Sequence, residues 1–129
     1  MILLDTHVWI WLVSEPTLLS DRATRAIEYA KVLGLCPISI WEISTKEVLG
    51  RLAFDRPFEV WLAQLLAQPR LKTFELTPQI AALAGQLGKA GFHGDPADRM
   101  IVATTLQLGI PLVTKDAAIR DFDQVETVW

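Results

Sequence analysis

Short apolar runs alternate along this chain with longer stretches that have helical spacing. Residues 2–4, 35–38 and 110–113 are short runs typical of buried strands, and residues 125–128 form a last run of the same kind. Residues 71–76 alternate enough to form a further strand or an extended connector. Because strands separated by helices are joined by crossover connections, the pattern predicts an α/β fold with a parallel sheet that is covered on both faces.

The stretches between these runs carry the capping residues and apolar spacing of helices. A capping box at Ser39 and Glu42 predicts one helix start, and Asp95 before Pro96 predicts another. Gly109 is expected to end the latter helix. The expected helices cover approximately residues 7–14, 21–33, 39–50, 57–67, 78–89 and 96–108.

The composition is that of a chain that can bury a core. Of its 129 residues, 51% are apolar, so we expect a single folded domain over residues 1–129. The net charge of −3 argues against a general nucleic-acid coat protein, whose affinity would need a basic face. It leaves room for an enzyme that holds nucleic acid with a few local Arg and Lys side chains.

Export and membrane insertion are not expected. Asp5 interrupts the region where a signal peptide would need a basic and then an apolar run. No apolar run approaches the roughly 18 residues of a membrane helix. The single cysteine, Cys36, excludes a disulfide within the chain and is interpreted as a small core residue. These features predict a cytoplasmic protein.

Acidic residues stand where the predicted strands end. Asp5 ends the first strand, and Glu42 follows the second strand in the first turn of a helix. Asp95 and Asp98 begin a helix, and Asp116 follows the strand at 110–113. Ligands of such sheets gather beyond the carboxyl ends of the strands. If these junctions lie at the same edge, four or five carboxylates meet there.

Most of these acids also have a structural interpretation. Glu42 fits the capping box of its helix, and Asp95 fits an N-cap. Asp98 would interact favourably with the helix dipole, and Asp116 could stabilise a turn. Asp5 is the hardest to explain in this way, because it has no evident helix to cap.

Several carboxylates close in space repel one another and raise one another's pKa, unless a cation neutralises them. Oxygen ligands favour a hard ion, which here means Mg²⁺ or Mn²⁺. Cys36, His7 and His93 lack the spacing of a zinc site. Carboxylate-bound ions of this kind activate water for phosphodiester cleavage, so the acids predict a metal-dependent hydrolase of phosphodiesters.

Four segments of the chain resemble a known family. They are "ILLDTHVWIWL" at the start, "ISIWEISTKEVLGRL" at 38–52, "FHGDPADRMIVATTLQLGIPLVTKD" at 92–116 and the closing "VETVW". Together they resemble the PIN-domain ribonuclease toxins of bacterial toxin–antitoxin pairs, the VapC type. The resemblance covers nearly the whole chain. It implies a three-layer α/β/α sandwich, metal-dependent endoribonuclease activity, a homodimer and inhibition by a small cognate antitoxin.

The resemblance also implies the site residues. By position, the catalytic acids are Asp5, Glu42, Asp98 and Asp116. Asp95 belongs to the "DPxDR" motif and is expected to cap the helix or to serve as an auxiliary ligand. We hypothesise that Asp5, Asp98 and Asp116 bind one or two Mg²⁺ or Mn²⁺ ions, with Glu42 and Asp95 as additional candidate ligands.

In this hypothesis Glu42 orients or deprotonates the attacking water, and the products carry a 5′-phosphate and a 3′-hydroxyl. Thr6 and Thr114 flank two of the acids and are candidate hydroxyl neighbours of the metal or phosphate. Local cations would hold the RNA, although one of them could instead pair with Glu42 four residues away. The candidate cations are Lys46, Arg51, Arg99, Lys115 and Arg120.

The histidines and the aromatic residues are assigned structural roles. The metal mechanism needs neither His7 nor His93, so we expect both to be structural or peripheral. The segment 58–68 is apolar on a broad face, which either packs on its own chain or forms part of a groove for an antitoxin helix. The tryptophans expected in the core are Trp9, Trp11 and Trp41.

Two other classes of protein fit the sequence poorly. A phosphoacceptor signalling domain would need an acidic pair after its first strand, where this chain has Asp5 alone. A dinucleotide-binding domain would need a glycine fingerprint there, and "DTHVWIW" has none. A third alternative stays open, namely a catalytically weak PIN-like domain that acts mainly by binding RNA or a partner protein.

Overall fold

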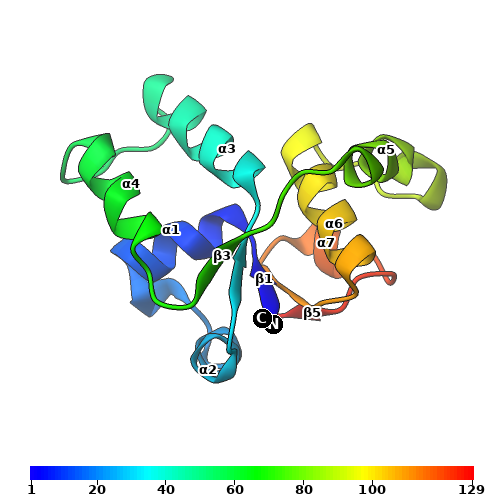
Figure 1. Cartoon of the computed structure of the whole chain (residues 1–129), viewed down its shortest axis with the longest axis horizontal. Helices are drawn as coiled ribbons and strands as arrows, with labels where there is room; N and C mark the ends of the chain where they lie inside the picture. Colours follow the sequence, from blue (N-terminus) through cyan, green and yellow to red (C-terminus); the bar gives the residue numbers. More distant parts are fainter.

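A five-stranded parallel sheet lies at the centre of the molecule (Figure 1). The computed structural model describes all residues, 1–129. The strands follow the order β3-β2-β1-β4-β5, and every neighbouring pair is parallel. The predicted parallel sheet is therefore confirmed, and the ambiguous segment after residue 70 contributes an edge strand. The strands are β1 (Ile2–Leu4), β2 (Leu33–Leu35), β3 (Leu71–Thr73), β4 (Leu112–Val113) and β5 (Thr127–Val128).

Helices cover both faces of this sheet. In Figure 1, α1, α2 and α4 lie on one side of the sheet and α5, α6 and α7 on the other. The three-layer α/β/α sandwich is thus confirmed. The helices are α1 (Thr6–Ser14), α2 (Asp21–Tyr29), α3 (Pro37–Val48), α4 (Phe58–Leu66), α5 (Pro78–Gln86), α6 (Pro96–Leu108) and α7 (Ala117–Arg120), with short 3₁₀ helices η1 (Pro16–Leu18) and η2 (Leu87–Ala90).

The two faces of the sheet bury separate cores because side chains alternate along each strand. In β1, Ile2 and Leu4 belong to the core beneath α1, α2 and α4, whereas Leu3 belongs to the core beneath α5, α6 and α7. In β2, Gly34 lies on the second face, where a Cβ atom would overlap the ring of Phe74. Glycine at this position lets the ring of Phe74 pack directly on the strand.

The connection between β2 and α3 differs from the sequence prediction. Helix α2 ends at Tyr29, and the strand covers 33–35 rather than 35–38. Helix α3 then begins at Pro37, two residues before the predicted capping box. The reason is that proline lacks an amide hydrogen and fits the first position of a helix better than a central strand. The prediction of a capping box at Ser39 and Glu42 was therefore wrong, and Glu42 lies in the second turn of α3.

Helix α3 lies where the two helical layers meet. It contacts α1 on one side and α6 on the other. Its inward residue Ile43 is fully buried in the first core. This position brings the exposed side of α3 next to the start of α6. None of the helices is both long enough and apolar enough to span a membrane.

Candidate active site

Asp5 lies at the carboxyl edge of the sheet, directly after β1, and is only 3% exposed. One of its carboxylate oxygens accepts the backbone N–H of Thr6 at 2.7 Å. The other accepts the hydroxyl of Thr114, which follows the neighbouring strand β4, at 2.6 Å. Two donors from two elements therefore fix this carboxylate in place.

Asp5 also serves as the N-cap of α1. The expectation that it caps no helix was wrong, because α1 begins at the next residue after it. Burial raises the pKa of Asp5, and nearby Glu42 raises it further, while His7 and the hydrogen bonds from Thr114 and Thr6 oppose this shift. The structure thus holds a carboxyl group whose negative charge is only partly compensated.

Thr114 links Asp5 to Asp116. The hydroxyl of Thr114 that donates to Asp5 also accepts the backbone N–H of Asp116 at 3.0 Å. The carboxylate of Asp116 in turn caps the short helix α7 by accepting the N–H of Ile119 at 3.0 Å. Thr114 is therefore a hydroxyl neighbour of Asp5 and Asp116, and it couples their positions.

A second hydroxyl pair ties α3 to the same edge. The hydroxyl of Thr6 donates to the hydroxyl of Ser39 at 2.9 Å, and both residues are buried. Ser39 lies in the first turn of α3, one turn before Glu42. The bond thus fixes the start of the helix that carries Glu42 against the end of β1.

The remaining two acids begin α6. Asp95 is the N-cap, as predicted, and accepts the backbone N–H of Asp98 at 2.8 Å. Asp98 is half-buried, and its carboxylate accepts no hydrogen bond from the protein. Burial raises the pKa of Asp98 to about 7, and the negative charges of its neighbours add to the shift. Those neighbours are Asp95, Asp5, Asp116 and Glu42.

The acids thus lie within electrostatic reach of one another, although they come from four different parts of the chain. They do not form a finished set of ligands, because no three His, Cys, Asp or Glu side chains are grouped closely enough to hold an ion. Coordination of Mg²⁺ requires oxygens at about 2.0–2.1 Å, a much shorter range than charge repulsion. A hard divalent cation fits the donor chemistry and would relieve the repulsion that, after burial, adds to the raised pKa of Asp98.

His7 lies closer to the acids than the sequence suggested. Its Nδ1 is 3.6 Å from the carboxylate of Asp5, and its Nε2 accepts the backbone N–H of Lys115 at 2.9 Å. The ring also meets Trp11 edge-on, with 5.0 Å between the ring centroids. Burial lowers the pKa of His7 despite the neighbouring acids. The Nδ1 side of the His7 ring therefore faces Asp5, whereas His93 is exposed in a loop.

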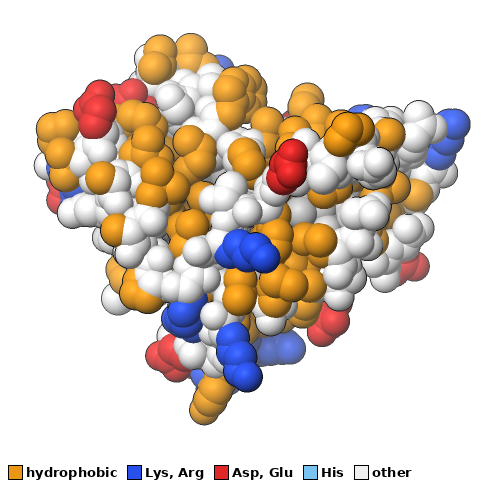
Figure 2. Space-filling model, viewed as in Figure 1, with side chains coloured by type: hydrophobic (Ala, Val, Ile, Leu, Met, Phe, Trp, Pro, Cys, Tyr) orange, Lys and Arg blue, Asp and Glu red, His pale blue; other side chains and the backbone are white.

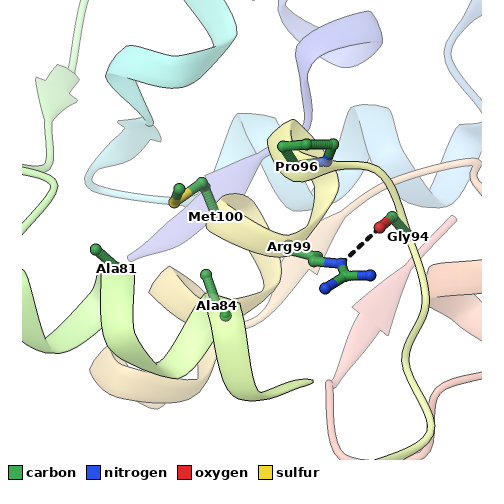
Figure 3. Close-up of a pocket in the computed structure, with 7 residues that line it drawn as sticks. Ala81, Ala84, Gly94, Pro96, Arg99 and Met100 are labelled. Atoms are coloured by element: carbon green, nitrogen blue, oxygen red, sulfur yellow. Dashed lines mark hydrogen bonds between the residues drawn. The ribbon is translucent and has the colours of Figure 1, made fainter. Parts of the chain in front are cut away.

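Three of the candidate cations have partners within the chain, and the first is Lys115, whose Nζ lies 5.8 Å from the centroid of the Trp11 ring. Lys46 lies 3.4 Å from Glu42, the i,i+4 pair that the sequence allowed. The side chain of Arg99 points back at the loop before α6, where its Nε donates to the carbonyl of Gly94 at 2.7 Å (Figure 3). The cavity beside it, of about 360 Å³ between α5 and α6, is lined by none of the predicted acids. Arg99 therefore positions the start of α6.

A smaller cavity, of about 220 Å³, lies between α3 and the start of α6 and is lined by Glu42 and Asp95. Trp41 also lines it and is 60% exposed, so the expectation that Trp41 belongs to the core was wrong. The inward residues of α3 are Ser39 and Ile43, and a residue midway between them faces the opposite side of a helix. Trp9 is fully buried as expected.

The parallel sandwich with acids at its carboxyl edge is the arrangement of a PIN domain, and the sequence profile of the PIN domain matches residues 2–125. A Mycobacterium tuberculosis protein, ribonuclease VapC22, is 41% identical over 130 residues, which cover 99% of this chain and 98% of that protein. The chain therefore belongs to the PIN-domain family and, within it, to the VapC group.

Solved structures of the same group share the fold. VapBC2 from Rickettsia felis bound to a promoter DNA fragment gives a TM-score of 0.71 at 15% identity, over 98% of this chain and 97% of that chain. DNA-bound VapBC from Salmonella typhimurium gives 0.69 at 19% identity, over 98% and 95%. At such low identity the likeness concerns the fold alone.

Proposed function

We propose that this protein is a Mg²⁺- or Mn²⁺-dependent endoribonuclease and the toxin of a toxin–antitoxin pair. The observation that carries the proposal is the gathering of five acids within electrostatic reach of one another at the carboxyl edge of the sheet, namely Asp5, Glu42, Asp95, Asp98 and Asp116. Burial, and then the charges of the other four, raise the pKa of Asp98 to about 7. Carboxylates that repel one another at a sheet edge are a stable arrangement only if protons or a cation compensate them. The 41% identity to a ribonuclease over the whole chain supports the same conclusion.

The acids divide into metal ligands and a base. Asp5, Asp98 and Asp116 would hold the ion, with Glu42 and Asp95 beside them as additional ligands. A bound divalent ion supplies a Lewis acid for the phosphodiester and lowers the pKa of water. Glu42 orients the attacking water and accepts its proton, and cleavage leaves a 5′-phosphate and a 3′-hydroxyl.

The surrounding residues keep these acids in position. Thr114 holds the Asp5 carboxylate by its 2.6 Å hydrogen bond, and the pair between Thr6 and Ser39 keeps α3 close to β1. His7 lies between Asp5, 3.6 Å from its Nδ1, and the backbone N–H of Lys115, 2.9 Å from its Nε2, and so links the end of β1 to the segment after β4. Each of these contacts restricts a carboxylate before substrate arrives, which is how a site reduces the cost of reorganisation.

RNA would be held by local cations rather than by a broad basic face. On the face shown in Figure 2, Lys and Arg side chains gather mainly around α2 and β3. This group lies near the amino ends of the strands, at the opposite end of the sheet from the acids, so it is not the proposed RNA site. The overall charge of −3 agrees with a substrate site of limited extent. Because its proposed substrate is RNA, we propose that the protein acts in the cytoplasm.

The proposed protein partners are a cognate antitoxin and a second copy of the chain. The support for an antitoxin is the shared fold with VapBC structures, which include DNA-bound assemblies. Helix α4 packs on its own chain through the buried residues Trp61 and Leu65, whereas Val60 and Leu66 are about half exposed. Only the outer side of α4 is therefore open to a partner.

The test is cleavage of total cellular RNA by the purified protein in Mg²⁺ or Mn²⁺, with an EDTA control. We expect discrete fragments that disappear in EDTA and in the Asp5→Asn variant, while Asp123→Asn, an exposed acid outside the cluster, cleaves like the wild type. The proposal fails if the Asp5→Asn variant cleaves as well as the wild type. RNA binding without any metal-dependent cleavage would identify the catalytically weak, binding-only alternative.

A further inference from the structure

The cavity between α3 and α6 joins the acidic edge to an aromatic surface. Glu42 and Asp95, which are two members of the acidic cluster, line it together with Trp41. Its volume of about 220 Å³ is smaller than the roughly 300–1,000 Å³ of pockets that enclose whole small molecules. It therefore suits one planar ring system at the edge of a larger ligand.

Most of the side chains that line the cavity come from two adjacent faces of α3. Trp41, Thr45 and Leu49 are spaced by four residues and share one face of α3, and Glu42 and Lys46 lie on the adjacent face. Trp41 and Leu49 are 60% and 59% exposed, so the fold does not use them as core residues. An aromatic plane is thus exposed to solvent one residue away from a proposed catalytic acid.

Two cations complete the surface. Lys46 makes only a single ion pair, at 3.4 Å to Glu42, and its side chain is 45% exposed. Arg51 is exposed and makes no ion pair, and its backbone N–H bonds the carbonyl of Lys46 at 2.9 Å. That bond folds the chain back after α3, which places Arg51 at the cavity.

We propose that this cavity is a subsite for one nucleotide that flanks the scissile phosphodiester of single-stranded RNA. The base stacks on Trp41, and Lys46 and Arg51 contact its phosphate. The inference rests on the proposed ribonuclease function and adds a residue that determines how the substrate is positioned. Stacking on an aromatic side chain is sequence-tolerant, because every base has a π-face.

The chemistry favours a single strand over other ligands. Double-stranded RNA keeps its bases stacked inside the helix and is recognised by shape, so it could not present a base to Trp41. The centres of protein interfaces are depleted of Lys and of acids, whereas charged side chains of both signs surround this tryptophan. A nucleotide needs both features, namely an aromatic plane and a cation for its phosphate.

The first experiment measures binding of a fluorescein-labelled single-stranded RNA dodecamer of mixed sequence by anisotropy. All proteins carry Asp5→Asn, so that cleavage does not consume the probe. We expect Trp41→Ala to weaken binding by roughly 5- to 150-fold, the range for the loss of one stacked base, and Trp41→Phe to retain most of the affinity. Tyr29→Ala is the matched control, because Tyr29 is 85% exposed on α2 at the other end of the molecule.

The second experiment measures the salt dependence of the same binding. Removing one phosphate contact to a single strand should reduce the slope of log K against log salt concentration by about 0.7. We expect this reduction in Arg51→Gln and not in Arg22→Gln, which removes an exposed charge from α2.

Equal RNA affinities of the parent protein and the Trp41→Ala variant would overturn the proposal, as would a parent protein that does not bind the dodecamer. A change in molar mass by light scattering with unchanged RNA affinity would also overturn it, and would assign the surface to contact between two copies. None of these outcomes depends on cleavage. Metal-dependent cleavage by the wild type, measured separately, decides the proposed function itself.

Discussion

Asp5 and Asp98 represent two regions of the acidic edge that are built in opposite ways. Asp5, between β1 and α1, is almost completely buried, and its two oxygens accept hydrogen bonds from Thr6 and Thr114. Asp98, in the first turn of α6, is half-buried and accepts no hydrogen bond from the protein. Both have a raised pKa, with burial as the largest cause. The comparison separates a carboxylate that the fold fixes from one that is free to respond to protons or a cation.

The largest expected effect on stability comes from removing the hydroxyl that fixes Asp5. Thr114→Val leaves a buried carboxylate oxygen and the N–H of Asp116 without their partner. We expect the free energy of unfolding to fall by about 1–3 kcal/mol, measured by urea denaturation. Thr105→Val is the matched control, since the buried hydroxyl of Thr105 donates to the carbonyl of Val102 in its own helix at 2.7 Å. Equal losses in the two variants would show that Thr114 has no special role.

The second prediction concerns the pH dependence of stability and tests Asp98. Its pKa rises from an ordinary value of 3.8 to about 7 on folding. Between these values the folded state binds more protons than the unfolded state, so the free energy of unfolding falls as pH rises from about 4 to about 7 and then levels off. We expect Asp98→Asn to remove part of this fall and to exceed the wild type in stability at pH 8, as measured by denaturation in EDTA.

Asp123→Asn serves as the control for that series, because Asp123 is exposed and lies outside the cluster. It should keep the pH profile of the wild type. An Asp98→Asn profile that falls as steeply as the wild-type profile would mean that Asp98 is not the responsive carboxylate, and the contrast with Asp5 would fail.

The smallest effect is expected at the ion pair on α3. Lys46→Gln removes the pair with Glu42, in which the lysine side chain is 45% exposed. Because exposed i,i+4 pairs are worth little, we expect the free energy of unfolding to change by less than about 0.5 kcal/mol, as measured by urea denaturation. A loss above about 1 kcal/mol would place Glu42 among the carboxylates that the fold fixes, together with Asp5.

The position of the acids could be predicted from the sequence because parallel strands end at a common edge. Asp5 and Asp116 each follow a strand, so their proximity needed only the correct strand assignment. Asp95 was also predictable, since an aspartate before a proline is a strong helix start. Family resemblance then distinguished Asp98 from Asp95, which spacing alone did not.

Other features depend on contacts that the sequence does not reveal. The strands have only two or three residues, so their bounds are difficult to predict from the sequence. Strand β2 begins two residues earlier than predicted, α3 also begins two residues earlier, and Trp41 consequently faces outward. The role of Asp5 as N-cap of α1 was not predicted either, because α1 begins directly after β1 without a connecting loop. The raised pKa of Asp98 results first from burial and then from charges on four separate segments, and both arise only when the fold brings these segments together.

The measurement that tests the central claim most directly is calorimetric titration of Mn²⁺ into the wild type, Asp98→Asn and Asp123→Asn at pH 7. We predict binding to the wild type and to Asp123→Asn, and affinity at least about 10-fold lower in Asp98→Asn. Repeating the titration in buffers of different ionisation enthalpy should show proton release by the wild type that is reduced in Asp98→Asn, because the pKa of Asp98 is about 7. No binding to the wild type, or equal binding to all three proteins, would contradict the claim that the acids form a metal site.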